Sequence, residues 1–259
     1  MNKADVAAGP AYEVDLYRHG TCRILGRYAY HSVMKDRDHR YDIYLAVITG
    51  NGISALIDTG MASMPEMNRG AGFLMSELIT QEPGQDAIGI LRQAGLAPED
   101  VDYVLLTHFH YDHCSNLPLF TRAKVTVPAR AWEAWRCDQP QRRYLPEGLF
   151  QYLIRLESQG RLVVLDEGLV VPGIGVKWVG GHTICSTFIY VNTAQGVALF
   201  TGDAVQLYGN VEHDDIIHIH EDEEQCRRAL QIAREDGDIL MPGHDPLVFE
   251  RYPGGIRST

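Results

Sequence analysis

The sequence lacks the features of secreted and membrane-spanning proteins. Its five cysteines are odd in number and scattered, with no CxxC pair. This pattern is typical of reduced thiols in a cytoplasm rather than of a disulfide framework. No stretch reaches the roughly 18 apolar residues of a membrane span, and the N-terminus has no apolar core of signal-peptide length. We therefore expect a cytoplasmic protein that does not bind membranes.

Basic residues are also scarce. Lys and Arg number 23 against 34 Asp and Glu, which gives a formal net charge of −11. A protein that binds nucleic acid needs a positive field to attract phosphates. The charge therefore disfavours nucleic acid, and we expect a small-molecule substrate. The sequence leaves open whether the chain forms a homodimer.

Repeats of fixed period and low-complexity linkers are absent as well. Hydrophobic residues make up 45% and charged residues 22% of the 259 residues, which is typical of an ordinary globular protein. A chain of this length can form one large domain or two small ones, and no linker divides it. We therefore expect a single domain over residues 1–259.

Strand and helix patterns alternate along both halves of the chain. The Gly50-Asn51-Gly52 turn between two apolar runs within residues 43–58 predicts a hairpin. Further strands are predicted at 103–107, 176–179, 186–191, 197–201 and 238–241, and helices at 85–94 and 221–234. This mixture favours an α/β fold in which two sheets pack together with helices outside.

A histidine-rich run directly follows the predicted strand at 103–107. Within six residues it contains His108, His110, Asp112 and His113. One face of a strand or helix cannot present all four side chains, so a loop must gather them. Imidazoles and a carboxylate suit Zn²⁺ or a similar divalent ion, and burying them unpaired would cost about 1–3 kcal/mol each. A metal site is favoured over the alternative of a solvent-exposed polar loop.

Three more ligand-type residues each follow an apolar strand and a glycine. They are His182, Asp203 and His244. Taken alone, each would more often be structural. Together with the histidine-rich run they predict a site assembled at the ends of several strands, where glycine lets the backbone approach closely.

This pattern of HxHxDH followed by a strand-end His, Asp and His resembles the metallo-β-lactamase superfamily. The resemblance extends from ALIDTG at 55–60 to PGHD at 242–245. It implies an αββα sandwich of two mixed β-sheets with helices on the outer faces and two metals at one edge. By this resemblance, one metal is held by His108, His110 and His182, the other by Asp112, His113 and His244, and Asp203 bridges both. It also implies that Asp58 orients a ligand histidine.

Within the superfamily, the chain is most similar to the N-acyl-homoserine lactonase group. Asp203 stands where the commonest dinuclear β-lactamases have cysteine, and His110 stands where diiron flavoproteins have glutamate. The resemblance implies a lactonase that opens an N-acyl-homoserine lactone or a related lactone, in which a hydroxide bridging two divalent ions attacks the ring carbonyl. Zinc is the expected metal, with Mn, Fe or Co as alternatives. The alternative function is hydrolysis of another ester, an amide, a carbamate or a phosphodiester.

The resemblance also assigns catalytic roles to side chains near the metals. Asp112 or Asp203 would move the proton. Well-known lactonases carry a tyrosine three residues after the bridging aspartate, where this chain has Gln206. Tyr208, two residues further on, is the candidate for hydrogen bonding to the carbonyl or its oxyanion, with aromatic packing as an equal alternative.

Two segments allow more than one interpretation. The methionine-rich stretch at 61–75 could form an apolar wall over the metals, although core packing is favoured. The run at 213–220 contains three histidines and could suggest a third metal, although a strand or loop with solvated polar positions is favoured.

Overall fold

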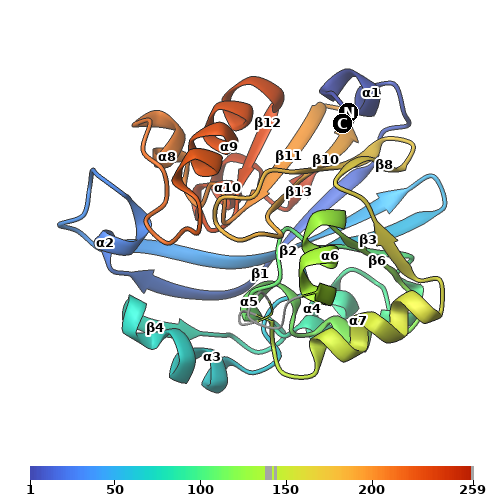
Figure 1. The fold of residues 1–259 in the computed structure, drawn as a ribbon, viewed down its shortest axis with the longest axis horizontal. Helices are drawn as coiled ribbons and strands as arrows, with labels where there is room; N and C mark the ends of the chain where they lie inside the picture. The colour runs from blue at the N-terminus through green and yellow to red at the C-terminus, as the bar shows by residue number, and fades with distance from the viewer. Residues whose placement is uncertain (138–141, 143–144, 258–259) are drawn as a thin grey trace.

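Two β-sheets lie face to face at the centre of the molecule, and helices cover their outer faces (Figure 1). The computed structural model describes residues 1–137, 142 and 145–257. The larger sheet has the order β13-β1-β2-β3-β5-β6-β7, and β4 pairs with β1. Its strands are β1 (Glu13–Ile24), β2 (His39–Gly50), β3 (Ile53–Ile57), β4 (Met75–Thr80), β5 (Tyr103–Leu105), β6 (Lys124–Val127), β7 (Leu162–Val164) and β13 (Gly255–Ile256).

The smaller sheet has the order β12-β11-β10-β9-β8. Its strands are β8 (Glu167–Val171), β9 (Ile174–Trp178), β10 (Thr187–Thr193), β11 (Gly196–Gly202) and β12 (Ile239–Pro242). Both sheets mix parallel and antiparallel pairs: β11 and β12 are parallel, whereas β10 and β11 are antiparallel. The predicted αββα sandwich of two mixed sheets is therefore confirmed.

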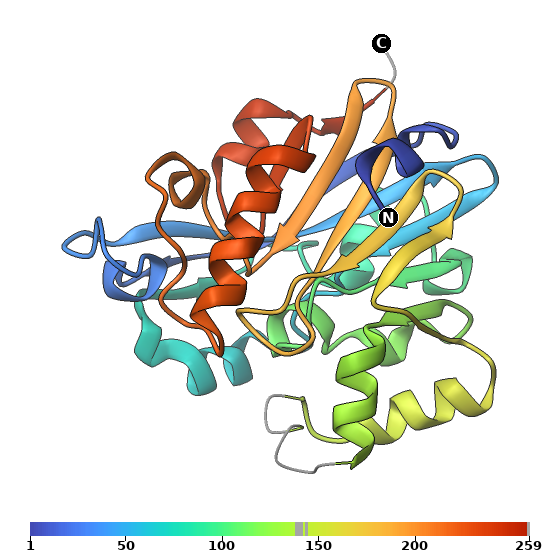
Figure 2. The ribbon, with the colours of Figure 1, turned by 45° about the horizontal axis from the view of Figure 1, so that its top comes forward.

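Helices form the two outer layers, as the tilted view in Figure 2 also shows. The larger sheet is covered by α4 (Ala87–Gln93), α6 (Ala129–Cys137) and α7 (Leu149–Ser158), and the smaller one by α1 (Lys3–Ala7) and α9 (Glu223–Asp236). The remaining helices are short: α2 (Gly26–Ala29), α3 (Met64–Ala71), α5 (Tyr111–Cys114), α8 (Tyr208–Glu212) and α10 (Leu247–Arg251). In the described part of the chain, no helix combines the length and apolar character that a membrane crossing needs.

The apolar run of β2 explains why the larger sheet is buried on both faces. Leu45 and Val47 pack under the outer helices, whereas Ala46 and Ile48 face the smaller sheet. Successive side chains of a strand point to opposite faces, so a continuous apolar run suits a strand with two covered faces. Each such large side chain contributes roughly 1.5–3 kcal/mol when buried.

The predicted hairpin is confirmed, with β2 paired to β3 from Gly50↔Ile53 onward. Asn51 and Gly52 both adopt positive φ, at 53° and 75°. Two successive positive φ values are what a tight turn between twisted strands requires.

The predicted strand at 103–107 is shorter in the structure and ends at Leu105. The amide of Leu106 donates to the Thr126 hydroxyl, and the amide of Thr107 donates to a carboxylate oxygen of Asp58. Side chains thus replace the neighbouring strand as hydrogen-bond partners. This change releases the chain from the sheet directly before the histidine-rich run.

Candidate metal centre

The histidine-rich run becomes a loop followed by the single helical turn of α5. His110 is the N-cap residue, and its carbonyl accepts hydrogen bonds from the amides of His113 and Cys114. The turn brings Asp112 and His113 back beside the preceding loop, which carries His108. One short segment therefore presents four side chains to one point.

The other three predicted ligands come from the smaller sheet. His182 lies in the turn after β9, Asp203 directly follows β11, and His244 follows β12 after one glycine. Gly202 precedes Asp203 with a φ of 49°, and a Cβ there would lie 2.6 Å from the Thr107 hydroxyl oxygen. Glycine at this position is required because the ends of β5 and β11 approach each other so closely.

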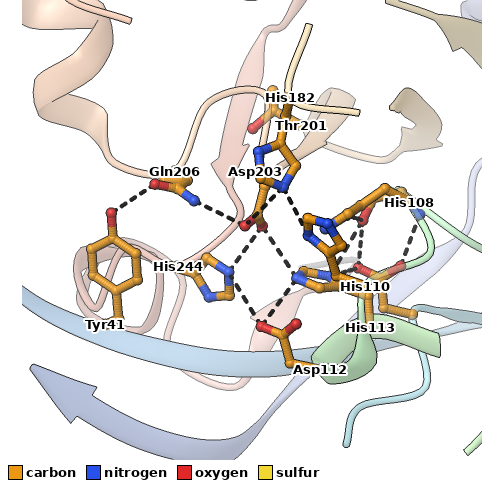
Figure 3. A network of polar contacts seen from close by, with 12 residues as sticks. Tyr41, His108, His110, Asp112, His113, His182, Thr201, Asp203, Gln206 and His244 are labelled. Carbon is orange, nitrogen blue, oxygen red and sulfur yellow. Dashed lines mark hydrogen bonds and ion pairs between the residues drawn. The ribbon is translucent and has the colours of Figure 1, made fainter. Parts of the chain in front are cut away.

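All seven side chains converge at one edge of the two sheets (Figure 3). His113 Nε2 lies 3.2 Å and His244 Nε2 lies 2.9 Å from Oδ1 of Asp203. On the other side, His182 Nε2 lies 3.0 Å from His110 Nδ1 and 3.7 Å from Oδ2 of Asp203. Asp203 thus stands between two groups of nitrogen and oxygen donors.

The donor atoms fall into groups suited to metal binding, with the atoms of each group within 4.8 Å of one another. The first group is His108, His110 and His182; the second is Asp112, His113 and His244; a third joins His108 and His113 to Asp203. The first two contain the same residues that the superfamily resemblance assigns to two metals, and Asp203 has the place between them.

In several of these histidines, one ring nitrogen contacts another group of the protein and the other ring nitrogen faces the centre of the cluster. Nδ1 of His182 lies 2.7 Å from the carbonyl of Ile219, and Nδ1 of His113 lies 2.8 Å from Asp58 Oδ2. Such contacts fix the orientation of a metal-binding imidazole. The expected contact between Asp58 and one of these histidines is therefore present.

Three buried atoms of the cluster have no hydrogen-bond partner in the described residues. They are Nε2 of His108, Nε2 of His113 and Oδ1 of Asp203. Nε2 of His113 and Nε2 of His244 nevertheless lie within ion-pair distance of Oδ1 of Asp203, at 3.2 and 2.9 Å. Unpaired buried polar atoms are rare and costly. Nitrogen and carboxylate donors left facing one another in this way fit divalent metal ions.

The electrostatics of the cluster agree with this fit. Burial and the neighbouring histidines hold the pKa of His110 down to about 3, and they hold the pKa of His108 well below its usual value. Neutral imidazole is the form that binds a metal. Burial disfavours a charge on His113, but the carboxylates of Asp112 and Asp58 outweigh this effect and raise its pKa. The carboxylate side of the centre therefore attracts positive charge.

Tyr208 does not reach this centre. Its hydroxyl donates to the carbonyl of Leu240 at 2.8 Å, and its ring packs in the core between the sheets under the Arg251 guanidinium. Tyr208 opens helix α8, and unlike Gln206 it does not line the cavity beside the metal-binding side chains. This placement does not support the oxyanion role expected from the sequence, and it favours the packing alternative.

A cavity of about 560 Å³ opens onto the metal-binding side chains. One wall comes from α3 and the following segment, and includes Met67, Ala71, Phe73 and Met75. Phe73 is 69% exposed. The methionine-rich stretch therefore forms an apolar wall of the cavity, whereas the sequence favours core packing for it. Among its methionines, Met61 is the one that is fully buried in the core.

The run at 213–220 is a loop after α8. His213 and His218 are exposed, and the candidate metal groups found among the described residues include none of its histidines. The solvated-loop interpretation is confirmed at these positions. Between them, Ile216 and Ile217 are buried in the core, which the sequence pattern did not indicate.

Sequence reasoning also missed Tyr41 as a residue of the site. Its hydroxyl donates to Gln206 Oε1 at 2.8 Å, and both residues line the cavity. Tyr41 lies on β2, 165 residues from Gln206 along the chain. No motif surrounds it, so only the pairing of distant strands reveals its place.

Comparisons with known proteins agree with this geometry. N-acyl homoserine lactonase AiiA of Bacillus thuringiensis subsp. kurstaki is 26% identical over 199 residues, which cover 73% of this chain and 76% of that protein. Metallo-beta-lactamase domain-containing protein 1 of Homo sapiens is 31% identical over 162 residues, covering 61% of this chain and 53% of that protein.

Solved structures share the fold. A structure of an N-acyl homoserine lactone hydrolase with the product N-hexanoyl-L-homoserine at its catalytic metal centre superimposes with a TM-score of 0.75 at 20% identity, covering 92% of this chain and 95% of that one. The dizinc quorum-quenching lactonase AidC gives a TM-score of 0.62 at 14% identity, covering 97% and 92%. The model of the metallo-beta-lactamase superfamily matches residues 41–244, well over half of the sequence, and the chain therefore belongs to the metallo-β-lactamase superfamily.

Proposed function

We propose that this superfamily hydrolase is a dinuclear metal-dependent lactonase that opens a lactone carrying an apolar substituent. The observation that carries the proposal is the metal-binding donor set at the end of an apolar cavity. The relationship to N-acyl homoserine lactonases supports the choice of a cyclic ester. Zinc is the proposed metal, because histidine and carboxylate ligands suit it.

The cavity lining favours a neutral substrate. Among the described residues that line it there is no lysine or arginine, and Glu66 adds a negative charge near its mouth. A phosphodiester or a carboxylate would have no cationic side chain to pair with on entering. A lactone with an alkyl or acyl chain would instead bury its chain against Met67 and Met75, at about 0.8 kcal/mol for each methylene.

Two divalent ions bound by these ligands would lower the pKa of a shared water and polarise a carbonyl. The chain itself supplies proton acceptors beside the point of attack. Asp112 lines the cavity beside the metal-binding histidines. Its carboxylate can accept the proton of the attacking water and return it to the leaving alkoxide. Asp203, held by the Gln206 amide, positions the donors on either side of it.

The test is ring opening by purified protein reconstituted with zinc or manganese and followed with a pH indicator. γ-Lactones with short and long substituents form the panel, with an anilide, a carbamate and a phosphodiester beside them. We expect the lactones to be opened faster than any other class. If no lactone reacts while one of the others does, the protein is instead a hydrolase of that class.

A further inference from the structure

The turn that carries His182 packs against the start of helix α9. It spans residues 180–186 and begins with two glycines, whose φ values are 66° at Gly180 and 85° at Gly181. A Cβ at Gly181 would lie 2.7 Å from Sγ of Cys226 in α9. Glycine lets the backbone come this close, but it restricts the backbone less than any other residue. The position of His182 therefore depends on contacts from outside the two glycines.

Three hydrogen bonds from the start of α9 hold the backbone of Gly181. The amides of Glu221 and Asp222 donate to its carbonyl at 2.8 and 3.0 Å, and its own amide donates to Oε1 of Gln225 at 2.9 Å. Nε2 of Gln225 donates to Oδ2 of Asp222 at 2.8 Å. Because a carboxylate only accepts, this contact fixes which end of the Gln225 side chain faces Gly181. The peptide groups before and after Gly181 are both held in this way.

Two further contacts hold the turn at His182 itself and beyond it. The amide of Ile184 donates to Oε2 of Glu221 at 2.8 Å, and the carbonyl of Ile219 lies 2.7 Å from Nδ1 of His182. The imidazole is thus oriented at its own ring, and the backbone is held one residue before it and two residues after it. All of these partners come from residues 219–225, so one short stretch of chain sets the direction of the metal-binding imidazole.

The second donor group has a different support. Its His113 is oriented by Asp58, which follows β3 of the larger sheet. Helix α9 instead covers the smaller sheet, and its start holds the turn of His182 in the first group. Removal of contacts of this kind lowers metal affinity by about 10–100-fold. Loss of one support should therefore weaken mainly the ion of its own group.

We propose that Gln225 and Glu221 are positioning residues for one of the two ions. They hold the turn that carries His182, and they thereby set the affinity of the first donor group separately from that of the second. Neither belongs to the described residues that line the cavity, so both act through His182 and not on a substrate. This inference rests on the proposed dinuclear metal centre, and it does not depend on which substrate the protein hydrolyses.

The test measures the two zinc affinities separately, by stepwise competition with a chelating dye on the metal-free full chain. Gln225→Met has a side chain of similar length without the acceptor for Gly181. We expect it to bind one ion about tenfold or more weakly than wild type and the other nearly unchanged. Asp58→Asn should weaken the other ion instead. In cobalt-loaded protein, the visible absorption that Gln225→Met loses should be the same that His182→Ala loses.

Glu221 supplies a second pair of variants at an exposed position, where loss of the fold is not expected. Glu221→Gln keeps an oxygen that can accept from Ile184 and should retain the wild-type affinities. Glu221→Met should weaken the same ion as Gln225→Met. Glu224→Gln is the matched control, because Glu224 is exposed in the first turn of α9 and pairs with Arg228. It should bind both ions like wild type.

Unchanged affinities in Gln225→Met, or equal weakening of both ions, would overturn the inference while leaving the metal centre intact. The same holds if Glu221→Gln loses as much affinity as Glu221→Met. Wild-type protein that binds fewer than two ions would overturn the proposed centre itself, and the inference with it.

Discussion

Asp58 Oδ2 and His113 Nδ1 lie 2.8 Å apart, although 55 residues separate them along the chain. Asp58 directly follows β3, and its carboxylate also accepts hydrogen bonds from the amide and the hydroxyl of Thr107. Its φ of 57° lies in the left-handed region, which asparagine and aspartate tolerate better than most residues. A single strained residue thus ties the ends of β3 and β5 to a metal-binding histidine.

Asp58→Asn should weaken metal binding by about 10–100-fold with little loss of folding, because asparagine tolerates the backbone conformation but lacks the charge that orients His113. Zinc affinity is measured by competition with a chelating dye. Asp102→Asn is the control, since Asp102 accepts the Ser54 amide in an exposed turn away from the centre. Equal affinities of the two variants would show that Asp58 does not support a metal ligand.

Asp203→Asn should reduce turnover far more than His213→Ala. Asp203 stands between the two donor groups, and its carboxylate contacts both. The asparagine side chain of the variant is neutral, so the negative charge shared by the two groups would be lost. His213 is exposed in the loop after α8. The comparison uses kcat/KM on the best lactone together with metal content. If His213→Ala abolishes turnover and Asp203→Asn does not, our assignment of ligands is wrong.

Ala71→Phe should shorten the range of substituents that the cavity accepts. Ala71 lies at the end of α3 in the apolar wall. Each methylene that can no longer be buried costs roughly 0.8 kcal/mol. Blocking the space of a few methylenes should therefore lower kcat/KM by about tenfold or more for a lactone with a ten-carbon chain. A lactone with a four-carbon chain should be nearly unaffected. Ser76→Phe adds a ring at an exposed position of β4 outside the cavity and should leave both substrates unaffected. A uniform loss with Ala71→Phe would speak against this wall as the chain-binding surface.

Removing metal should lower thermal stability. Each ion that binds the folded chain at about 100 times its Kd stabilises it by roughly 2.7 kcal/mol, which corresponds to a shift in Tm of about 5–10 °C for a chain of this size. Scanning calorimetry with and without a chelator measures the shift. Asp203→Asn should show a smaller difference, and an unchanged Tm in the wild-type protein would argue against bound metal.

The sequence predicted the parts of the site that are local. His108 to His113 lie within one loop, and His182, Asp203 and His244 each follow an apolar strand and glycine, so a pattern of residue types was sufficient. The layered fold followed from the same strands and helices, together with the resemblance. Asp58 was placed by the resemblance, which implies that it orients a ligand histidine.

The cavity could not be predicted, because it depends on contacts between distant segments. β4 pairs with β1 and carries the methionine-rich wall towards the metal-binding side chains, and no sequence pattern links the two strands. Tyr208 was expected in the site because it is near Gln206 in sequence. The start of α8 turns its side chain into the core instead, and Tyr41 from β2 lies beside Gln206 in the cavity wall.

The most direct test of a dinuclear centre is elemental analysis of purified protein after reconstitution with excess zinc or manganese and removal of unbound metal. We predict about two divalent ions per chain in wild type, and fewer in Asp203→Asn, because the two groups of donors meet at that carboxylate. One ion per chain or fewer in the wild-type protein would contradict the dinuclear assignment.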